Sequence, residues 1–166
     1  VGGDNYMYYY CEVWEKWTEV FDKLYANSKG NYWINLTCYA PPSPWFLRYV
    51  SSLWMQISND VGFIGKKGQV SDKDRMLSYR DENYMDFYNI RQFQFPQRAL
   101  YNHDPIYGNE AKVEMNDEDF RVYLFTMAMR GPCFWELYYS YNMMNEAKWR
   151  INYSVLRFLE DNIDVL

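Results

Sequence analysis

The chain has 166 residues, which is long enough for one domain with a hydrophobic core. Its formal net charge is −5, which argues against a nucleic-acid partner because such a partner requires a basic face. No apolar run approaches the roughly 18 residues of a membrane span, and no signal peptide is visible. We therefore expect a single domain over residues 1–166, with no nucleic-acid or membrane partner.

The three cysteines, Cys11, Cys38 and Cys133, are far apart and form no CxxC pair. They support neither a zinc site nor a disulfide framework. They leave the cellular compartment open, and a secreted or periplasmic location is compatible with them.

Aromatic residues make up 21% of the chain, including 7 Trp and 18 Tyr. Flat rings pack against the C–H face of a sugar, so this composition suits a carbohydrate-binding cleft as well as a large aromatic core.

The first third of the chain predicts a long helix followed by two strands. Apolar residues recur at three- and four-residue spacing over 6–28, with charged residues between them, which predicts an amphipathic helix. The β-forming run 32–40 predicts a strand that ends at a Pro-Pro pair. Residues 43–50 predict a short helix with a serine cap, and residues 53–58 predict a second strand.

The middle of the chain predicts a loop, a helix and a short strand. Residues 64–80 are rich in Gly and charge, which predicts a long loop, and residues 81–94 predict a helix. A third strand is expected at 98–101, before the turn sequence NHDPIYG. The run 116–130 predicts a helix that Asn116 caps, with acidic residues at the positive end of its dipole.

The last predicted elements are a strand at 133–139 and a closing helix at 145–161. Alternating strands and helices predict an α/β fold with a parallel sheet and right-handed crossovers. Four such units form about half of a TIM (β/α)₈ barrel or a small doubly wound sheet. No GxGxxG or GxxxxGK[ST] sequence follows a strand, which argues against a nucleotide-binding fold.

Polar side chains stand at the end of every predicted strand. They are Thr37, Cys38 and Tyr39, then Ser58, Asn59 and Asp60, then Asn102, His103 and Asp104, and finally Glu136, Tyr138 and Tyr139. In a parallel barrel the functional groups gather at the C-terminal ends of the strands. The coincidence of polar groups at all the predicted strand ends therefore indicates a binding or catalytic site there.

Each candidate also has a structural explanation. Asp60 can cap a turn before a glycine, and His103 can hydrogen-bond a backbone carbonyl. Asp104 forms a common turn pair with the proline that follows it, and Cys38 suits a small buried position. Glu136 is different because a carboxylate within an apolar strand needs a partner or a functional reason.

Several kinds of chemistry can be weighed from these residues. A metal site built from His103, Asp104 and Glu110 has suitable ligand types but no recognised spacing, so we expect no metal and no cofactor. The sequence lacks the GxSxG pattern of the nucleophile elbow, which argues against a serine hydrolase. Glycoside cleavage needs two carboxylates that face each other across the bond. Asp60 is the better candidate for proton transfer, and Glu136 is either its partner or a hydroxyl-binding group.

The sequence INLTCYAPPSPWFLRYVSSLWMQISND, with YNHDPIYG and EDFRVYLFTMAMRGPCFWEL after it, resembles the C-terminal half of the catalytic barrel of retaining α-glycosidases. The resemblance is to the α-galactosidases of glycoside hydrolase family 36 and their clan relatives. The endo-α-N-acetylgalactosaminidases are an alternative relative. The layout departs from the family where Pro41-Pro42 replaces a Gly-Gly pair. The family nucleophile would precede residue 1, so the chain would be a partial barrel from a longer protein, inactive in isolation.

The resemblance implies hydrolysis of an α-galactoside or α-N-acetylgalactosaminide with retention, with Asp60 as the acid/base. It also implies a set of substrate-binding residues, namely Cys38, Trp54, Asn59, Arg91, His103, Asp104, Glu136 and Tyr138. The expected partners are an oligosaccharide or glycoconjugate substrate, and either the missing half of the barrel or a second copy of the chain. A half barrel leaves sheet edges unpaired, which favours association. The alternative is a non-catalytic glycan-binding or structural module.

Overall fold

Helices and strands alternate along the chain. The computed structural model describes residues 4–36, 44–54, 59–90, 96, 99–102, 104–130 and 134–165. Its α-helices are α1 (Asp4–Ser28), α2 (Asp72–Met85), α3 (Asp117–Ala128) and α4 (Glu146–Asp161). Shorter helices are the 3-10 helix η1 (Pro44–Arg48), the π-helix η2 (Asp86–Ile90) and the 3-10 helix η4 (Tyr141–Met143). The strands are β1 (Asn35–Leu36), β2 (Ser52–Trp54), β3 (Leu100–Asn102), β4 (Ile106–Tyr107), β5 (Phe134–Trp135) and β6 (Tyr138–Tyr139).

The strands of the main sheet are all parallel, which confirms the predicted α/β class. Within the described residues, this sheet has the order β1-β2-β3-β5, which is also the order of the strands along the chain. Strands β4 and β6 pair separately, also in parallel. Because the main strands point the same way, their C-terminal ends lie along one edge of the sheet, where the site was expected.

One face of the main sheet is buried under helices. Leu53 and Leu100 face each other in register and are 2% and 0% exposed. They pack in one cluster with Phe21 of α1, Phe46 of η1 and Phe87 of η2. Alternate residues of a strand point to opposite faces, so the burial of these leucines sets the direction of their neighbours.

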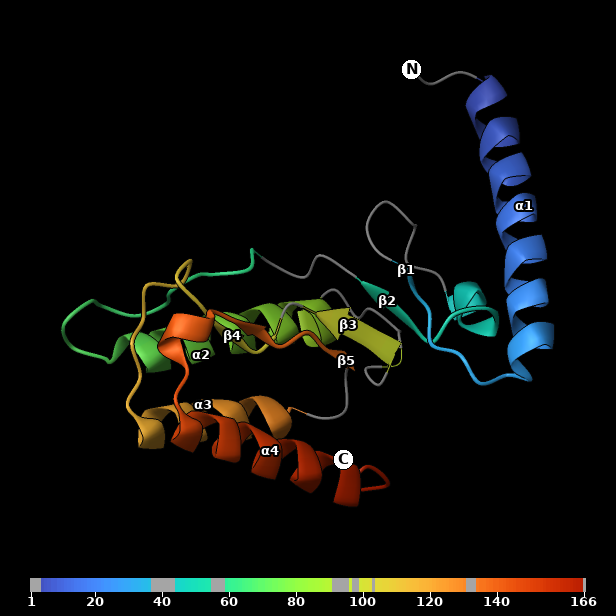
Figure 1. Ribbon diagram of the computed structural model, residues 1–166. Helices are drawn as coiled ribbons and strands as arrows, with labels where there is room; N and C mark the ends of the chain where they lie inside the picture. Colours follow the sequence, from blue (N-terminus) through green and yellow to red (C-terminus); the bar gives the residue numbers. More distant parts are fainter. Residues whose placement is uncertain are drawn as a thin grey trace.

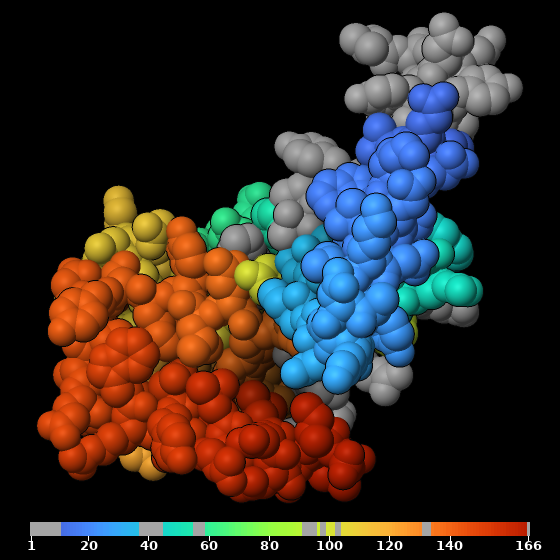
Figure 2. Space-filling model, turned by 45° about the vertical axis from the view of Figure 1, so that its right-hand side comes forward, coloured from blue at the N-terminus to red at the C-terminus, as the bar shows by residue number. Residues whose placement is uncertain are grey.

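The buried helix residues form two packing groups. Figure 1 shows α3 and α4 side by side, and buried residues of both helices share a second cluster with α2 and β4. Helix α1 packs against η1, where the Trp14 ring lies 4.4 Å from that of Phe46 between centroids. The N-terminal part of α1 extends away from the strands (Figure 1), and the residues of α1 coloured blue in Figure 2 stand out at one corner of the surface.

The predicted loop over 64–80 is wrong in its second half, because α2 begins at Asp72. The Ser71 side chain accepts a hydrogen bond from the Asp74 N–H at 3.1 Å, which caps the helix. Half of the residues of α2 are charged, and its buried residues are Met76, Leu77 and Arg80. This narrow buried stripe hides the helical period in the sequence, since a charged residue occupies one of its positions.

The first predicted strand begins later in the structure, at Asn35 rather than at residue 32. The described parts of the first two are β1 and β2, and residues 37–40 and 55–58 lie outside the described residues. The run 133–139 forms two strands rather than one, because β5 joins the main sheet and β6 pairs with β4. The helices predicted at 6–28, 116–130 and 145–161 are present as α1, α3 and α4.

Candidate functional site

The sheet face opposite the helix-covered leucines carries aromatic side chains. Trp54, Tyr101 and Phe134 are register neighbours on β2, β3 and β5, so their side chains leave the same face of the sheet. Trp33 lies across this row, with its ring centroid 6.2 Å from that of Tyr101 and 5.5 Å from that of Phe134. We call Trp33, Trp54, Tyr101 and Phe134 the aromatic face. Trp33 is 52% exposed, so the face is open to solvent at this ring.

A carboxylate stands at the C-terminal end of the aromatic face. Glu136 directly follows β5 and hydrogen-bonds the hydroxyl of Tyr101 on the neighbouring strand. Burial, and then the hydrogen bond and charge of Glu136, raise the pKa of Tyr101 to about 12. The neutral hydroxyl therefore donates to the carboxylate at ordinary pH. Tyr101 is the partner that a carboxylate in an apolar strand requires.

Polar groups lie on the same face of the sheet, two residues before Trp54 on β2 and at the paired position on β1. Asn35 of β1 and Ser52 of β2 face each other in register, and the Ser52 hydroxyl donates to Asn35 Oδ1 at 2.9 Å. Ser52 is fully buried, whereas Asn35 is partly buried. This face thus combines ring surfaces with a partly buried amide and a carboxylate, which is the mixture that a sugar ring can stack on and hydrogen-bond.

Asp60, the candidate acid/base, lies in an exposed turn after β2. The backbone N–H of Asn59 donates to the Tyr79 hydroxyl at 3.1 Å. The backbone carbonyl of Asp60 accepts from Arg80 Nη2 at 2.9 Å. Both side chains of this Asn59–Asp60 turn are exposed, so the carboxylate of Asp60 is accessible while its backbone is held by α2.

Asp104, expected to bind a substrate hydroxyl, is buried in an ion pair. Its Oδ2 lies 3.0 Å from Arg80 Nε, and each of these side chains is only 5% exposed. The pair borders a cavity of about 10 Å³ that Asp60, Tyr79 and Tyr123 also line, which is barely the space of one water molecule. A sugar does not fit there, so this placement favours the structural explanation of Asp104, and its predicted binding role stays a prediction.

Asp104 also influences the tyrosine beside it. Burial, and then the negative charge of Asp104, raise the pKa of the Tyr123 hydroxyl. That hydroxyl bridges the backbone of Ile106, accepting from its N–H and donating to its carbonyl, both at 3.0 Å. The ion pair of Asp104 and Arg80 is thus embedded in hydrogen-bonded core structure, not in an open cleft.

The remaining candidates fall in three places. Trp54 belongs to the aromatic face, next to Tyr101. Tyr138 is 39% exposed and lies on β6, outside the main sheet. Cys38, Arg91 and His103 lie outside the described residues. The structure therefore joins Trp54 and Glu136 through Tyr101, and it joins Asp60 and Asp104 through Arg80.

Sequence reasoning missed several residues of this region, namely Trp33, Ser52, Tyr79, Arg80 and Tyr101. For the strand residues a signal was present, because Ser52 and Trp54 alternate with the core residue Leu53, and an alternating pattern marks a second face. For Tyr79 and Arg80 the signal was hidden, because their segment was assigned to a loop.

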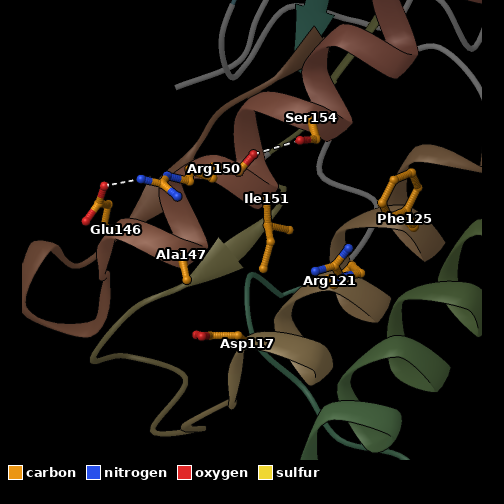
Figure 3. A pocket seen from close by; sticks show the side chains of 8 residues that line it. All are labelled: Asp117, Arg121, Phe125, Glu146, Ala147, Arg150, Ile151 and Ser154. Carbon is orange, nitrogen blue, oxygen red and sulfur yellow. Dashed lines mark hydrogen bonds and ion pairs between the residues drawn. The ribbon is translucent and has the colours of Figure 1, made fainter.

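A groove of about 590 Å³ lies apart from the strand ends, between α3 and α4 (Figure 3). Phe125, Ala147 and Ile151 form its apolar surface, and Arg150 at its rim is paired with Glu146. None of the predicted site residues lines this groove, so it does not belong to the candidate site.

The described residues hold no group of three or more His, Cys, Asp or Glu side chains with the geometry of a metal site. No helix among them is both long and apolar enough to cross a membrane. The chain matches no protein-family profile, no curated protein and no solved structure. The functional reading of the aromatic face and the Asn59–Asp60 turn therefore depends on their chemistry and on the sequence resemblance.

Proposed function

We propose that this chain forms about half of the (β/α)₈ barrel of an enzyme that hydrolyses α-galactosides or α-N-acetylgalactosaminides with retention. The observation that carries the proposal is the parallel sheet in chain order, with aromatic rings and a carboxylate on the face opposite the helix-covered leucines. A doubly wound sheet reverses its strand order at a switch point, whereas a barrel keeps chain order around the ring. The order β1-β2-β3-β5 supports the barrel.

The direction of the two sheet faces also supports this proposal. In a barrel, helices cover the outer face and the inner face surrounds the axis. Leu53 and Leu100 pack against helices, so the aromatic face would be the inner one. Trp33 and Trp54 would offer ring surfaces to a sugar, and Glu136 with Tyr101 would bind its hydroxyls.

In this proposal Asp60 is the acid/base. Its carboxylate would protonate the departing glycosidic oxygen, and it would then take a proton from the water that releases the sugar from the enzyme. The exposed Asn59–Asp60 turn, held at its backbone, suits a group that must exchange protons with substrate and water. The nucleophilic carboxylate would come from the other half of the barrel.

The test is the turnover of the full-length protein that contains this chain. Asp60→Asn removes the titratable carboxyl group and keeps the size of the side chain. We expect it to lower kcat by about 10²–10⁴-fold on an α-galactoside or α-N-acetylgalactosaminide whose leaving group is an alcohol. Asp164→Asn, at an exposed position near the end of the described chain, serves as the matched control. Wild-type turnover by Asp60→Asn would refute the assigned role.

A second function, glycan binding without catalysis, is favoured by one observation, the exposure of Trp33 on the aromatic face. A glycan array separates the two proposals. Specific binding by the isolated chain, lost in Trp33→Ala, together with no turnover by the full-length protein, would favour a binding module. Turnover that depends on Asp60 would favour the enzyme.

A further inference from the structure

Two consecutive residues of α2 hold the backbone of the Asn59–Asp60 turn. Tyr79 accepts a hydrogen bond from the N–H of Asn59, and Arg80 donates one to the carbonyl of Asp60. Neither bond involves the side chain of Asn59 or Asp60. The turn is therefore fixed through its main chain, which leaves the Asp60 carboxylate exposed and available for chemistry.

Arg80 is itself firmly held. Arg80 is 4% exposed as a whole residue. Its Nε lies 3.0 Å from Oδ2 of Asp104, whose side chain is equally buried. A guanidinium has five N–H donors in a rigid plane, so one group can bind a carboxylate and a carbonyl at the same time. Arg80 thus connects the turn after β2 with the segment after β3. The turn is fixed relative to the neighbouring strand end.

The ring of Tyr79 packs directly on the same turn at Gly62. A Cβ atom built on Gly62 would lie 2.3 Å from Tyr79 Cζ, which is far closer than any real contact. Only a glycine lets the ring come this near. The turn is therefore held at Asn59, at Asp60 and at Gly62 by two adjacent side chains of one helix.

We propose that Tyr79 and Arg80, which we call the α2 clamp, are positioning residues for the carboxylate of Asp60. The clamp itself follows from the contacts, whereas its catalytic consequence rests on the proposed function of Asp60 as acid/base. Proton transfer requires the donor within hydrogen-bonding reach of the leaving oxygen, and a displacement of about 1 Å can cost about a hundredfold in rate. Loosening the clamp should therefore lower kcat while substrate binding at the aromatic face persists.

Tyr79→Phe is the sharpest test, because it removes the acceptor of the Asn59 N–H and keeps the ring against Gly62. In the full-length protein we expect faster hydrogen exchange of the Asn59 amide and a fall in kcat of about tenfold or more, with KM changed by less than about twofold. Tyr153→Phe is the control, because Tyr153 is 66% exposed on α4. Arg80→Lys keeps the charge beside Asp104 but loses the planar fork, and should act in the same direction.

The same substitution in the Asp60→Asn variant distinguishes a positioning role of Tyr79 from a general effect on stability. If Tyr79→Phe acts through Asp60, it should not lower turnover further in a protein that already carries Asp60→Asn. An equal fall in both backgrounds would overturn the positioning role.

The exchange measurement tests the clamp separately from the enzyme. Unchanged exchange of the Asn59 amide in Tyr79→Phe would overturn the clamp, whatever the protein catalyses. Faster exchange in a full-length protein without glycosidase activity would refute the proposed function, and with it the catalytic role of the clamp, but not the mechanical contact.

Discussion

Glu136 and Asp104 show what a single residue does and does not reveal in a sequence. A carboxylate between apolar neighbours predicts a partner, and Glu136 has one in Tyr101. The identity of that partner depends on the register between β3 and β5, which no local pattern encodes. Asp104 was expected to bind the substrate, because it follows a predicted strand. In the structure Asp104 pairs with Arg80, whose segment was predicted as a loop, so its burial could not be foreseen, and its binding role stays a prediction.

The Tyr101 and Glu136 pair predicts a change in titration. Glu136→Gln removes the negative charge that, after burial, raises the pKa of Tyr101, so this pKa should fall below its value of about 12. A raised tyrosine pKa stabilises the fold fully below the unfolded value of about 10, and this contribution is lost as pH rises toward 12. In Glu136→Gln the loss should still begin near the unfolded value of about 10, but it should be smaller and should end at a lower pH.

The measurement is an NMR titration of the tyrosine ring carbons, with Tyr101→Phe to assign the signal. Glu114→Gln is the control, since Glu114 is exposed and lies after β4. An unchanged Tyr101 titration in Glu136→Gln would contradict the pairing.

At the scale of elements, the signals at helix ends were more reliable than the periodicity between them. Asn116 was predicted to cap a helix, and its side chain does accept from the Asp119 N–H at 2.8 Å. The first part of α2, residues 72–80, was missed although Ser71 and Asp74 follow the same capping spacing, whereas residues 81–85 fall within the helix predicted at 81–94. Half of the residues of α2 are charged, so the apolar period is weak. The helix is stabilised by the packing of Met76, Leu77 and Arg80 against the rest of the protein, which is a tertiary effect.

The cap of α2 can be tested by substitution. Ser71→Ala leaves the Asp74 N–H without its side-chain acceptor, and we expect a loss of about 1 kcal/mol in the free energy of unfolding. Ser78→Ala, at an exposed position within α2, should have almost no effect and controls for the loss of a hydroxyl. Urea unfolding curves measure both variants. Equal stability of the two would show that α2 does not begin at this cap.

At the scale of the whole molecule, the alternation of strands and helices predicted the parallel sheet correctly. The sequence predicted only in part which face of each strand is polar and which is apolar. The described strands of the main sheet are two or three residues long, which is too short for a clear alternating pattern. Apolar side chains on α1 remain 43–49% exposed, namely Trp17, Val20 and Leu24. Together with the aromatic face, they offer surface that a missing half of the barrel would cover. That partner, like a second copy of the chain, stays a prediction.

The most direct measurement of the central claim is the dependence of turnover on the leaving group, in the full-length protein and its Asp60→Asn variant. A series of aryl α-galactosides, with the matching N-acetylgalactosaminides, varies the acidity of the departing phenol. If Asp60 is the acid/base, the ratio of wild-type to variant turnover rises steadily as the phenol becomes less acidic, because the departing oxygen then depends more on proton donation. A ratio that stays constant across the series would contradict the account.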